Sequence, residues 1–210
     1  MFSERVTSLD RFFDPGAAGW AGVSTTSVEM VPAPLGLQPN EYIQVSWEDR
    51  DYGALESLDA KSVHDGAQIA IWLSWAKAKP DTGGQEGFPD SAALAFPIAD
   101  VPDITSMGTP KAPIHLLHWM ARKNALRAVV AQGIGSSMEG ADVAQSVKAG
   151  WTQGRWSVVF TRSLIAGKQA VSLVPGTQSQ IGFAVWDGSN EERAGIKAVS
   201  ADWTDFQIKE

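Results

Sequence analysis

Apolar and polar residues alternate over several short stretches of this chain, and a period of two residues is typical of a half-buried β-strand. The run from Gln68 onward is the clearest, because Ile69, Ile71, Leu73 and Trp75 share one face. Similar alternation or short apolar runs between turn-forming residues recur along the chain. The pattern predicts strands over residues 22–31, 42–47, 68–75, 90–98, 114–122, 126–132, 156–164 and 181–186.

Helical signals are few. Residues 137–149 form the best candidate, because the segment starts with serine, has acidic residues early and Lys148 late, and is followed by Gly150. The charged segment 48–65 is predicted to be a loop with a short helical turn around residues 54–58. Helices are therefore expected to be a minor part of the fold.

Many short strands separated by turn-rich loops predict an all-β protein, specifically an antiparallel β-sandwich with one or two short helices. We expect a single domain over residues 1–210, because no internal repeat, low-complexity tract or linker divides the chain. Residues 1–20 contain two aspartates, Pro15 and Gly16, and are predicted to be an irregular N-terminal arm.

The last hairpin contains one residue that breaks the pattern. Alternation over 181–186 resumes after a polar loop, where Lys197 shares the parity of the apolar Val199 and Trp203. A buried ammonium is unfavourable unless it is paired, neutralised or bound to a metal. The alternative is a lysine at a strand start that extends its amine back to solvent. The pattern alone leaves both interpretations open.

Composition excludes several classes of function. The net charge of −7 argues against nucleic-acid or anionic-membrane partners. No apolar run approaches the roughly 20 residues that span a bilayer, and the first residues lack the features of a signal peptide. The chain is therefore expected to stay in the cytosol, to be a matured form, or to be exported with a partner. The absence of cysteine excludes disulfides, iron–sulfur ligation, zinc thiolates and covalent c-type haem.

Catalytic patterns are sparse. The chain has three histidines, His64, His115 and His118, and no GxSxG elbow, HExxH motif, Walker loop or dinucleotide fingerprint accompanies them. Nine tryptophans are many for 210 residues; they predict aromatic core packing, or a stacking platform for sugars, or a wall for a flat cofactor. A binding or carrier domain is favoured over an independent enzyme.

Four segments, in order, resemble the haem b-binding gamma subunits of the ethylbenzene dehydrogenase family, which includes the gamma subunits of dimethyl sulfide dehydrogenase, selenate reductase, chlorate reductase and the steroid C25 dehydrogenases. These segments cover roughly the last 120 residues, and the ordered set is more specific than any one of them. They are FPDSAALAFP (88–97), Met107-Gly followed by His118-Trp119, WTQGRWSVVFTRSL (151–164), and FAVWDGSNEER (183–193) with KAVS (197–200).

The resemblance implies a β-sandwich that holds one non-covalent haem b. Its iron would take the Met107 sulfur and the Lys197 amine as axial ligands, which leaves no open position for a reactant. His118 is the alternative ligand and otherwise a pocket contact. Arg162 is expected either to pair with a propionate or to be an ordinary outward-facing strand charge. Trp119, like the tryptophans at 151, 156 and 186, is expected in the core or in a haem wall.

The resemblance further implies an electron-transfer subunit of a molybdoenzyme. Its partners would be a molybdenum-cofactor catalytic alpha subunit, an iron–sulfur beta subunit and an external electron carrier such as cytochrome c. It would be periplasmic, exported with a partner that carries the signal, and cytoplasmic if the resemblance misleads. The competing hypothesis is a carbohydrate- or small-ligand-binding β-sandwich module without haem, which would use exposed tryptophans as stacking platforms.

Overall fold

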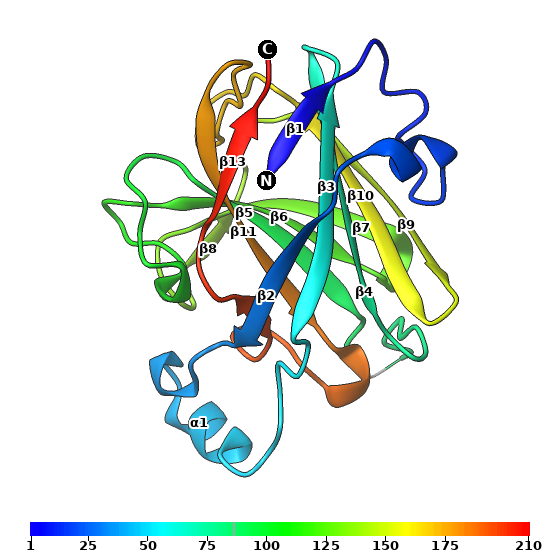
Figure 1. The fold of residues 1–210 in the computed structure, drawn as a ribbon. Coiled ribbons are helices and arrows are strands. Elements are labelled where there is room, and N and C mark those ends of the chain that lie inside the picture. The colour runs from blue at the N-terminus through cyan, green and yellow to red at the C-terminus, as the bar shows by residue number, and fades with distance from the viewer. Residues whose placement is uncertain (86) are drawn as a thin grey trace.

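The computed structural model describes residues 1–85 and 87–210, and two packed β-layers make up most of it (Figure 1). The strands are β1 (Phe2–Arg5), β2 (Thr26–Pro32), β3 (Ser57–His64), β4 (Gln68–Ala76), β5 (Ser91–Pro97), β6 (Ile114–Met120), β7 (Ala125–Ala131), β8 (Ser137–Glu139), β9 (Gln145–Thr152), β10 (Arg155–Ser163), β11 (Gln178–Trp186), β12 (Ala198–Ser200) and β13 (Thr204–Ile208). The helical elements are α1 (Glu41–Trp47) and the 3-10 turns η1 (Ala18–Gly22), η2 (Leu35–Leu37), η3 (Ile104–Ser106), η4 (Arg122–Asn124) and η5 (Gly188–Asn190).

The strand order is β8-β7-β6-β5-β11-β12-β2-β3-β4-β10-β9. One layer runs from β8 to β12, and the other contains β3, β4, β10 and β9 together with β1 and β13. Strands β2 and β11 contribute to both layers, since each pairs at one end with one layer and at the other end with the second. Pairing is antiparallel except where β1 meets β3 and β13. The predicted all-β antiparallel sandwich is confirmed.

Alternation of side chains assigns each strand of the first layer one inward and one outward face. The inward face packs against the other layer and supplies most of the core, including Leu94, Phe96, Leu117 and Trp119, all fully buried. The outward face of the same strands consists of the intervening residues, and it carries the site described below. No helix among the described residues is long and apolar enough to cross a membrane.

The predicted strand over 42–47 is wrong, because this segment is the helix α1, which lies at one end of the molecule (Figure 1). The run YIQVSW fits a strand by alternation, but Ile43 and Trp47 also stand four residues apart, one helical turn. Asn40 decides between them, because its side chain accepts a hydrogen bond from the amide of Tyr42 and caps the helix. Tyr42 itself is 82% exposed.

Two further predictions are wrong because strands lie where a helix and a loop were expected. The helix expected over 137–149 is replaced by β8, which pairs with β7, and by the first part of β9, which pairs with β10. Gly140 and a thin apolar face disfavour a helix there. The loop expected over 48–65 ends in β3, where buried Leu58 and Ala60 alternate with Asp59 and Lys61. Because Asp59 and Lys61 lie on the outer face of β3, the segment has a polar composition that obscures its alternation in the sequence.

The N-terminal arm is also more ordered than predicted. Residues 2–5 form β1, which pairs in parallel with β3 and β13. Ser3 is fully buried, and the hydroxyl of Ser62 donates a hydrogen bond to its side-chain oxygen at 2.9 Å. The expectation of an irregular arm holds for residues 6–17 only, because η1 begins at Ala18.

Candidate cofactor site

A cavity of about 430 Å³ lies on the outward face of the first layer. Alternate residues of β5, β6, β7 and β11 form its floor, and their neighbours in sequence belong to the core. Three of the floor positions are alanines, Ala93, Ala95 and Ala184, whose small side chains leave the space. Larger apolar side chains, including Leu116 and Val129, surround them. The cavity is therefore built to accept an apolar body.

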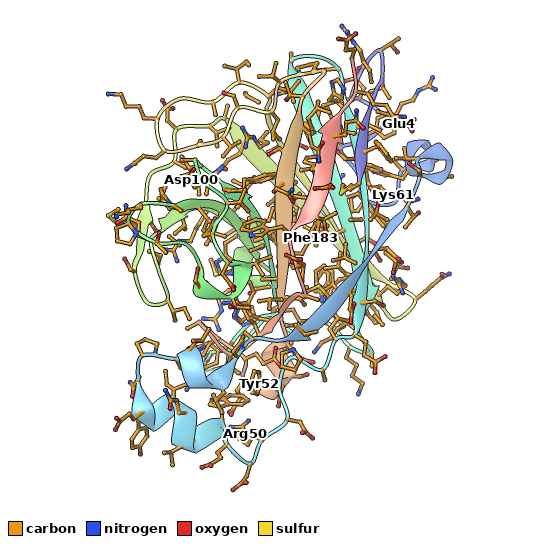
Figure 2. All side chains as sticks on the ribbon, turned by 60° about the vertical axis from the view of Figure 1, so that its left-hand side comes forward. Glu4, Arg50, Tyr52, Lys61, Asp100 and Phe183 are labelled. Carbon is orange, nitrogen blue, oxygen red and sulfur yellow. The ribbon has the colours of Figure 1, made fainter. Side chains whose placement is uncertain are left out.

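The segment around α1 covers one side of this cavity. Gln38, Pro39 and Ile43 line it, and Gln38 is only 5% exposed because its side-chain amide donates to the carbonyl of Gly195 at 3.3 Å. Tyr52 follows α1 in this segment (Figure 2), and its hydroxyl donates a hydrogen bond to the Ala33 carbonyl. The segment around α1 is thus hydrogen-bonded to the loop that carries Lys197.

Lys197 lies at the centre of the site, directly before β12. It is 3% exposed, and its Nζ lies 3.2 Å from the Sδ of Met107, 3.3 Å from the carbonyl oxygen of Ala194 and 5.3 Å from the ring centre of Trp186. Within the described residues no carboxylate lies within ion-pair distance of this amine. Burial therefore lowers the pKa of Lys197 to about 8. The amine is not extended back to solvent.

Lys77 is a second sequestered lysine, and unlike Lys197 it has acidic partners. Its side chain is 9% exposed, and its amine pairs with Asp187 and, at 3.2 Å, with Asp90. Burial alone lowers the pKa of Lys77, but the hydrogen bonds and charges of Asp187 and Asp90 outweigh it, so the pKa is raised. Among the described residues a sequestered lysine can thus have acidic partners, and the lack of one at Lys197 reflects the residues that surround it in the cavity.

Met107 reaches Lys197 from the loop after η3, and the backbone holds it there. Its φ of 56° places it in the left-handed region, and its carbonyl accepts a hydrogen bond from the amide of Gly133 at 3.1 Å. The next residue, Gly108, also has a positive φ, and a Cβ there would lie 2.7 Å from the Ala131 carbonyl. Only glycine allows this close approach of the loop to β7.

The loop between β11 and β12 is held by a buried carboxylate. Glu192 is 4% exposed and accepts hydrogen bonds from the backbone amides of Gly53 at 2.8 Å and Asp187 at 2.9 Å. It links the end of the α1 segment to the loop that presents Lys197. Sequence patterns do not reveal this role, since a glutamate in a polar loop carries no periodic signal.

His118 projects from β6 into the cavity, as the resemblance implies for a pocket contact. Its ring lies 4.9 Å from the ring of Trp186, and its Nε2 has no hydrogen-bond partner among the described residues. Burial, followed by the charges of Arg127 and Lys197, lowers the pKa of His118 to about 4. The imidazole is therefore neutral at pH 7 and available as a polar wall.

The structure does not bring Trp119 or Arg162 to the cavity. Trp119 follows His118 on β6 and so points the other way, into the core, where its ring lies 5.1 Å from Trp156. Arg162 lies on β10 in the opposite layer and is 1% exposed, which also excludes an outward-facing charge. Its guanidinium donates to the carbonyls of Ser163 and Val171. Burial lowers the pKa of Arg162 to about 10.

The remaining tryptophans divide between core and wall. Trp156 is 7% exposed and in the core, whereas Trp186 is 9% exposed and lines the cavity. The core prediction for Trp151 is wrong, because it lies on the edge strand β9 and is 36% exposed. Among the described strands β9 pairs only with β10, so its other side has no neighbouring strand to cover the indole ring.

Fold and cavity together define a β-sandwich binding protein with a buried amine and a thioether directed into an apolar pocket. Comparison with known proteins is consistent with this class. The profile described as ethylbenzene dehydrogenase matches residues 128–198. The gamma subunit of chlorate reductase from Ideonella dechloratans is 31% identical over 196 residues, which covers 90% of this chain and 77% of that protein.

Two other relatives have similar coverage. A protein of Haloferax mediterranei, named provisionally as the heme subunit ORF7 of a respiratory nitrate reductase, is 30% identical over 208 residues, covering 97% of this chain and 71% of that protein. The gamma subunit of dimethylsulfide dehydrogenase from Rhodovulum sulfidophilum is 27% identical over 199 residues, covering 90% and 73%. The chain belongs to the ethylbenzene dehydrogenase gamma-subunit family.

Solved structures that resemble this fold are carbohydrate-binding modules. A family 9 module of Caldicellulosiruptor kristjanssonii in complex with glucose has a TM-score of 0.56 at 9% identity, covering 100% of this chain and 95% of that one. Its complex with cellotriose gives 0.52 at 11% identity, covering 100% and 93%. At such low identity the likeness describes the sandwich fold alone.

Proposed function

We propose that this chain is the electron-transfer gamma subunit of a heterotrimeric molybdenum dehydrogenase or reductase, and that it holds one non-covalent haem b between Met107 and Lys197. The observation that carries the proposal is the contact of a buried, uncompensated amine with a thioether inside an apolar cavity. The relatives named as heme and gamma subunits support it. Bound there, haem would supply one-electron transfer.

The residues present suit such a ligand. An amine coordinates iron only through its free lone pair, and with a pKa of about 8 the Lys197 amine is neutral in about a tenth of molecules at pH 7. An ordinary lysine would be neutral in about one molecule in 3,000. The thioether of Met107 is a soft ligand that favours the reduced metal. The Lys197 amine is almost fully buried, and the cavity beside both groups is lined mainly by apolar residues.

The family supports a larger assembly. We infer a molybdenum-cofactor catalytic subunit and an iron–sulfur subunit as partners, and an external carrier such as cytochrome c as the other redox partner. The complex would be periplasmic and exported on the signal of a partner. No histidine or carboxylate constellation for independent catalysis gathers around the cavity in the described part of the chain, where His118 is the only histidine lining it.

A sugar-binding module is the weaker alternative. Stacking platforms need exposed, flat aromatic surfaces, yet Trp20, Trp47, Trp75 and Trp119 are at most 3% exposed. The exposed exception, Trp151, is held at the edge of β9 by a hydrogen bond from its indole nitrogen to the Lys77 carbonyl. These four tryptophans serve packing.

The test is the visible spectrum of the full chain, purified with ample haem supply and its natural companions. We expect a Soret band and sharp α and β bands on reduction. Met107→Ala and Lys197→Ala should each lose the low-spin spectrum, whereas Met138→Ala and Lys148→Ala, on exposed residues of the same types, should keep it. A colourless protein rejects the haem. An unchanged low-spin spectrum in both ligand variants rejects the ligand pair.

A further inference from the structure

Two arginines give the apolar cavity a cationic rim. Arg127 reaches it from β7 and Arg193 from the segment between η5 and β12. Lys197 is the third cation among the described lining residues, and Glu192 is the single carboxylate. That carboxylate already accepts hydrogen bonds from two backbone amides. The cavity is thus positive in a chain whose net charge is −7.

The two arginines flank the aromatic pair inside the cavity. Arg127 stands directly opposite His118 in the register of β7 and β6. Arg193 precedes Ala194, whose carbonyl accepts the indole hydrogen of Trp186 at 3.0 Å. The rings of His118 and Trp186 lie 4.9 Å apart, and both arginines line the same cavity as this ring pair.

Neither guanidinium is committed to a strong partner. Arg127 pairs with Glu139, but the side chains are 48% and 68% exposed, and such surface pairs contribute little. Arg193 lies 4.6 Å over the ring of Phe88 and donates to the backbone carbonyl of Glu191. No carboxylate pairs with it among the described residues. Both can turn to an incoming anion without leaving a buried charge behind.

We propose that Arg127 and Arg193 form a carboxylate-binding subsite and that they receive the two propionates of haem, the role the resemblance suggested for Arg162. The inference rests on the proposed function. A guanidinium matches a carboxylate in shape and charge, and a charge-assisted pair is stronger than a neutral hydrogen bond. The subsite fixes which edge of the flat ligand faces solvent. Arg162 cannot take this role, because it is buried in the other layer.

The experiment separates the carboxylates of the ligand from its apolar ring. Haem-free full-length protein is titrated with haemin and with haemin dimethyl ester, and binding is followed at the Soret band. Wild type should bind the diacid at least about tenfold tighter than the diester. Arg127→Gln and Arg193→Gln should each weaken the diacid about five- to tenfold, the range for partly exposed charged hydrogen bonds, and leave the diester unchanged.

Two variants serve as matched controls. Glu139→Gln breaks the same ion pair as Arg127→Gln but keeps the arginine, so it should bind the diacid as well as wild type or better. Arg50→Gln changes a half-exposed arginine outside the cavity and should have no effect. Where a variant resists preparation without haem, the rate of haem loss to excess apomyoglobin replaces the titration.

The outcomes are distinct. A double variant, Arg127→Gln with Arg193→Gln, that still prefers the diacid by the wild-type factor overturns the subsite. So does Glu139→Gln weakening the diacid as much as Arg127→Gln, because the ion pair and not the arginine is then what matters. Failure of wild type to bind either ligand overturns the proposed function itself.

Discussion

Replacing Lys197 by methionine should stabilise the haem-free protein while removing its proposed ligand. The lysine is 3% exposed, and burial lowers its pKa from 10.5 to about 8. This difference corresponds to about 3 kcal/mol by which the charged amine disfavours the folded state at pH 7. Methionine has a similar length without the charge and adapts to irregular apolar space. Lys197→Met should therefore raise the free energy of unfolding by about 3 kcal/mol at pH 7.

The stability gained by Lys197→Met should depend on pH in a direction that the lowered pKa determines. Between pH 8 and 10.5 the unfolded lysine still holds its proton, while the folded amine has lost it. Because the unfolded state binds more protons there, the stability of the wild type rises with pH across this window. Below pH 8 both states are protonated and the full penalty applies. The advantage of Lys197→Met should be greatest at pH 7 and nearly vanish by about pH 10.5.

Urea unfolding of both haem-free proteins between pH 7 and 10.5 measures this difference directly. Groups that titrate in both proteins cancel in the comparison. Lys148→Met, on a lysine whose side chain is 58% exposed, is the matched control and should change stability by no more than about 0.5 kcal/mol. An advantage of Lys197→Met that does not change with pH, or a less stable variant at pH 7, would refute the account of a buried, uncompensated charge.

Three further predictions concern the walls of the cavity. Glu192→Ala should lower the free energy of unfolding by about 2–4 kcal/mol in chemical denaturation, because it leaves buried amides unpaired, whereas the exposed Glu191→Ala should have almost no effect. Gly53→Ala should lower the melting temperature and weaken haem binding, because its φ is +59° and a Cβ would lie 2.7 Å from the Lys197 carbonyl. His118→Phe should keep the low-spin spectrum; loss of that spectrum would make His118 a ligand.

The strands that could be predicted are those whose period is visible without tertiary context. Residues 68–75 and 156–164 alternate cleanly and lie in the middle of a layer, as β4 and β10. The run 42–47 alternates equally well, but six residues fit both periods, and a capping side chain decided for a helix. Edge strand β9 was missed because its partly buried positions include Gln145 and Ala149, and Val147 is the only larger apolar residue among them.

The site was only partly predictable for a related reason. The parity of Lys197 marked it as a candidate inward lysine. Nothing in the sequence pattern pointed to Met107, which lies in a loop with a left-handed backbone and came from the resemblance alone. Strand parity also shows that His118 and Trp119 face opposite ways, but not which face holds the cavity. That depends on which face of the layer that contains β5, β6 and β7 packs against the other layer, a property of the whole sandwich.

The contrast between the two sequestered lysines indicates how a ligand in the cavity would change the stability of the fold. Lys77 is enclosed with two aspartates, so its charge is compensated and the ion cluster can serve the fold. Lys197 is enclosed with a thioether and an indole, neither of which carries a negative charge, and the haem-free fold is therefore less stable than it could be. A ligand that binds only the folded state restores stability, by about 2.7 kcal/mol when present at 100 times its Kd. That amount is close to the penalty at Lys197, so occupancy of the cavity at such a concentration would offset the destabilisation that the buried amine creates.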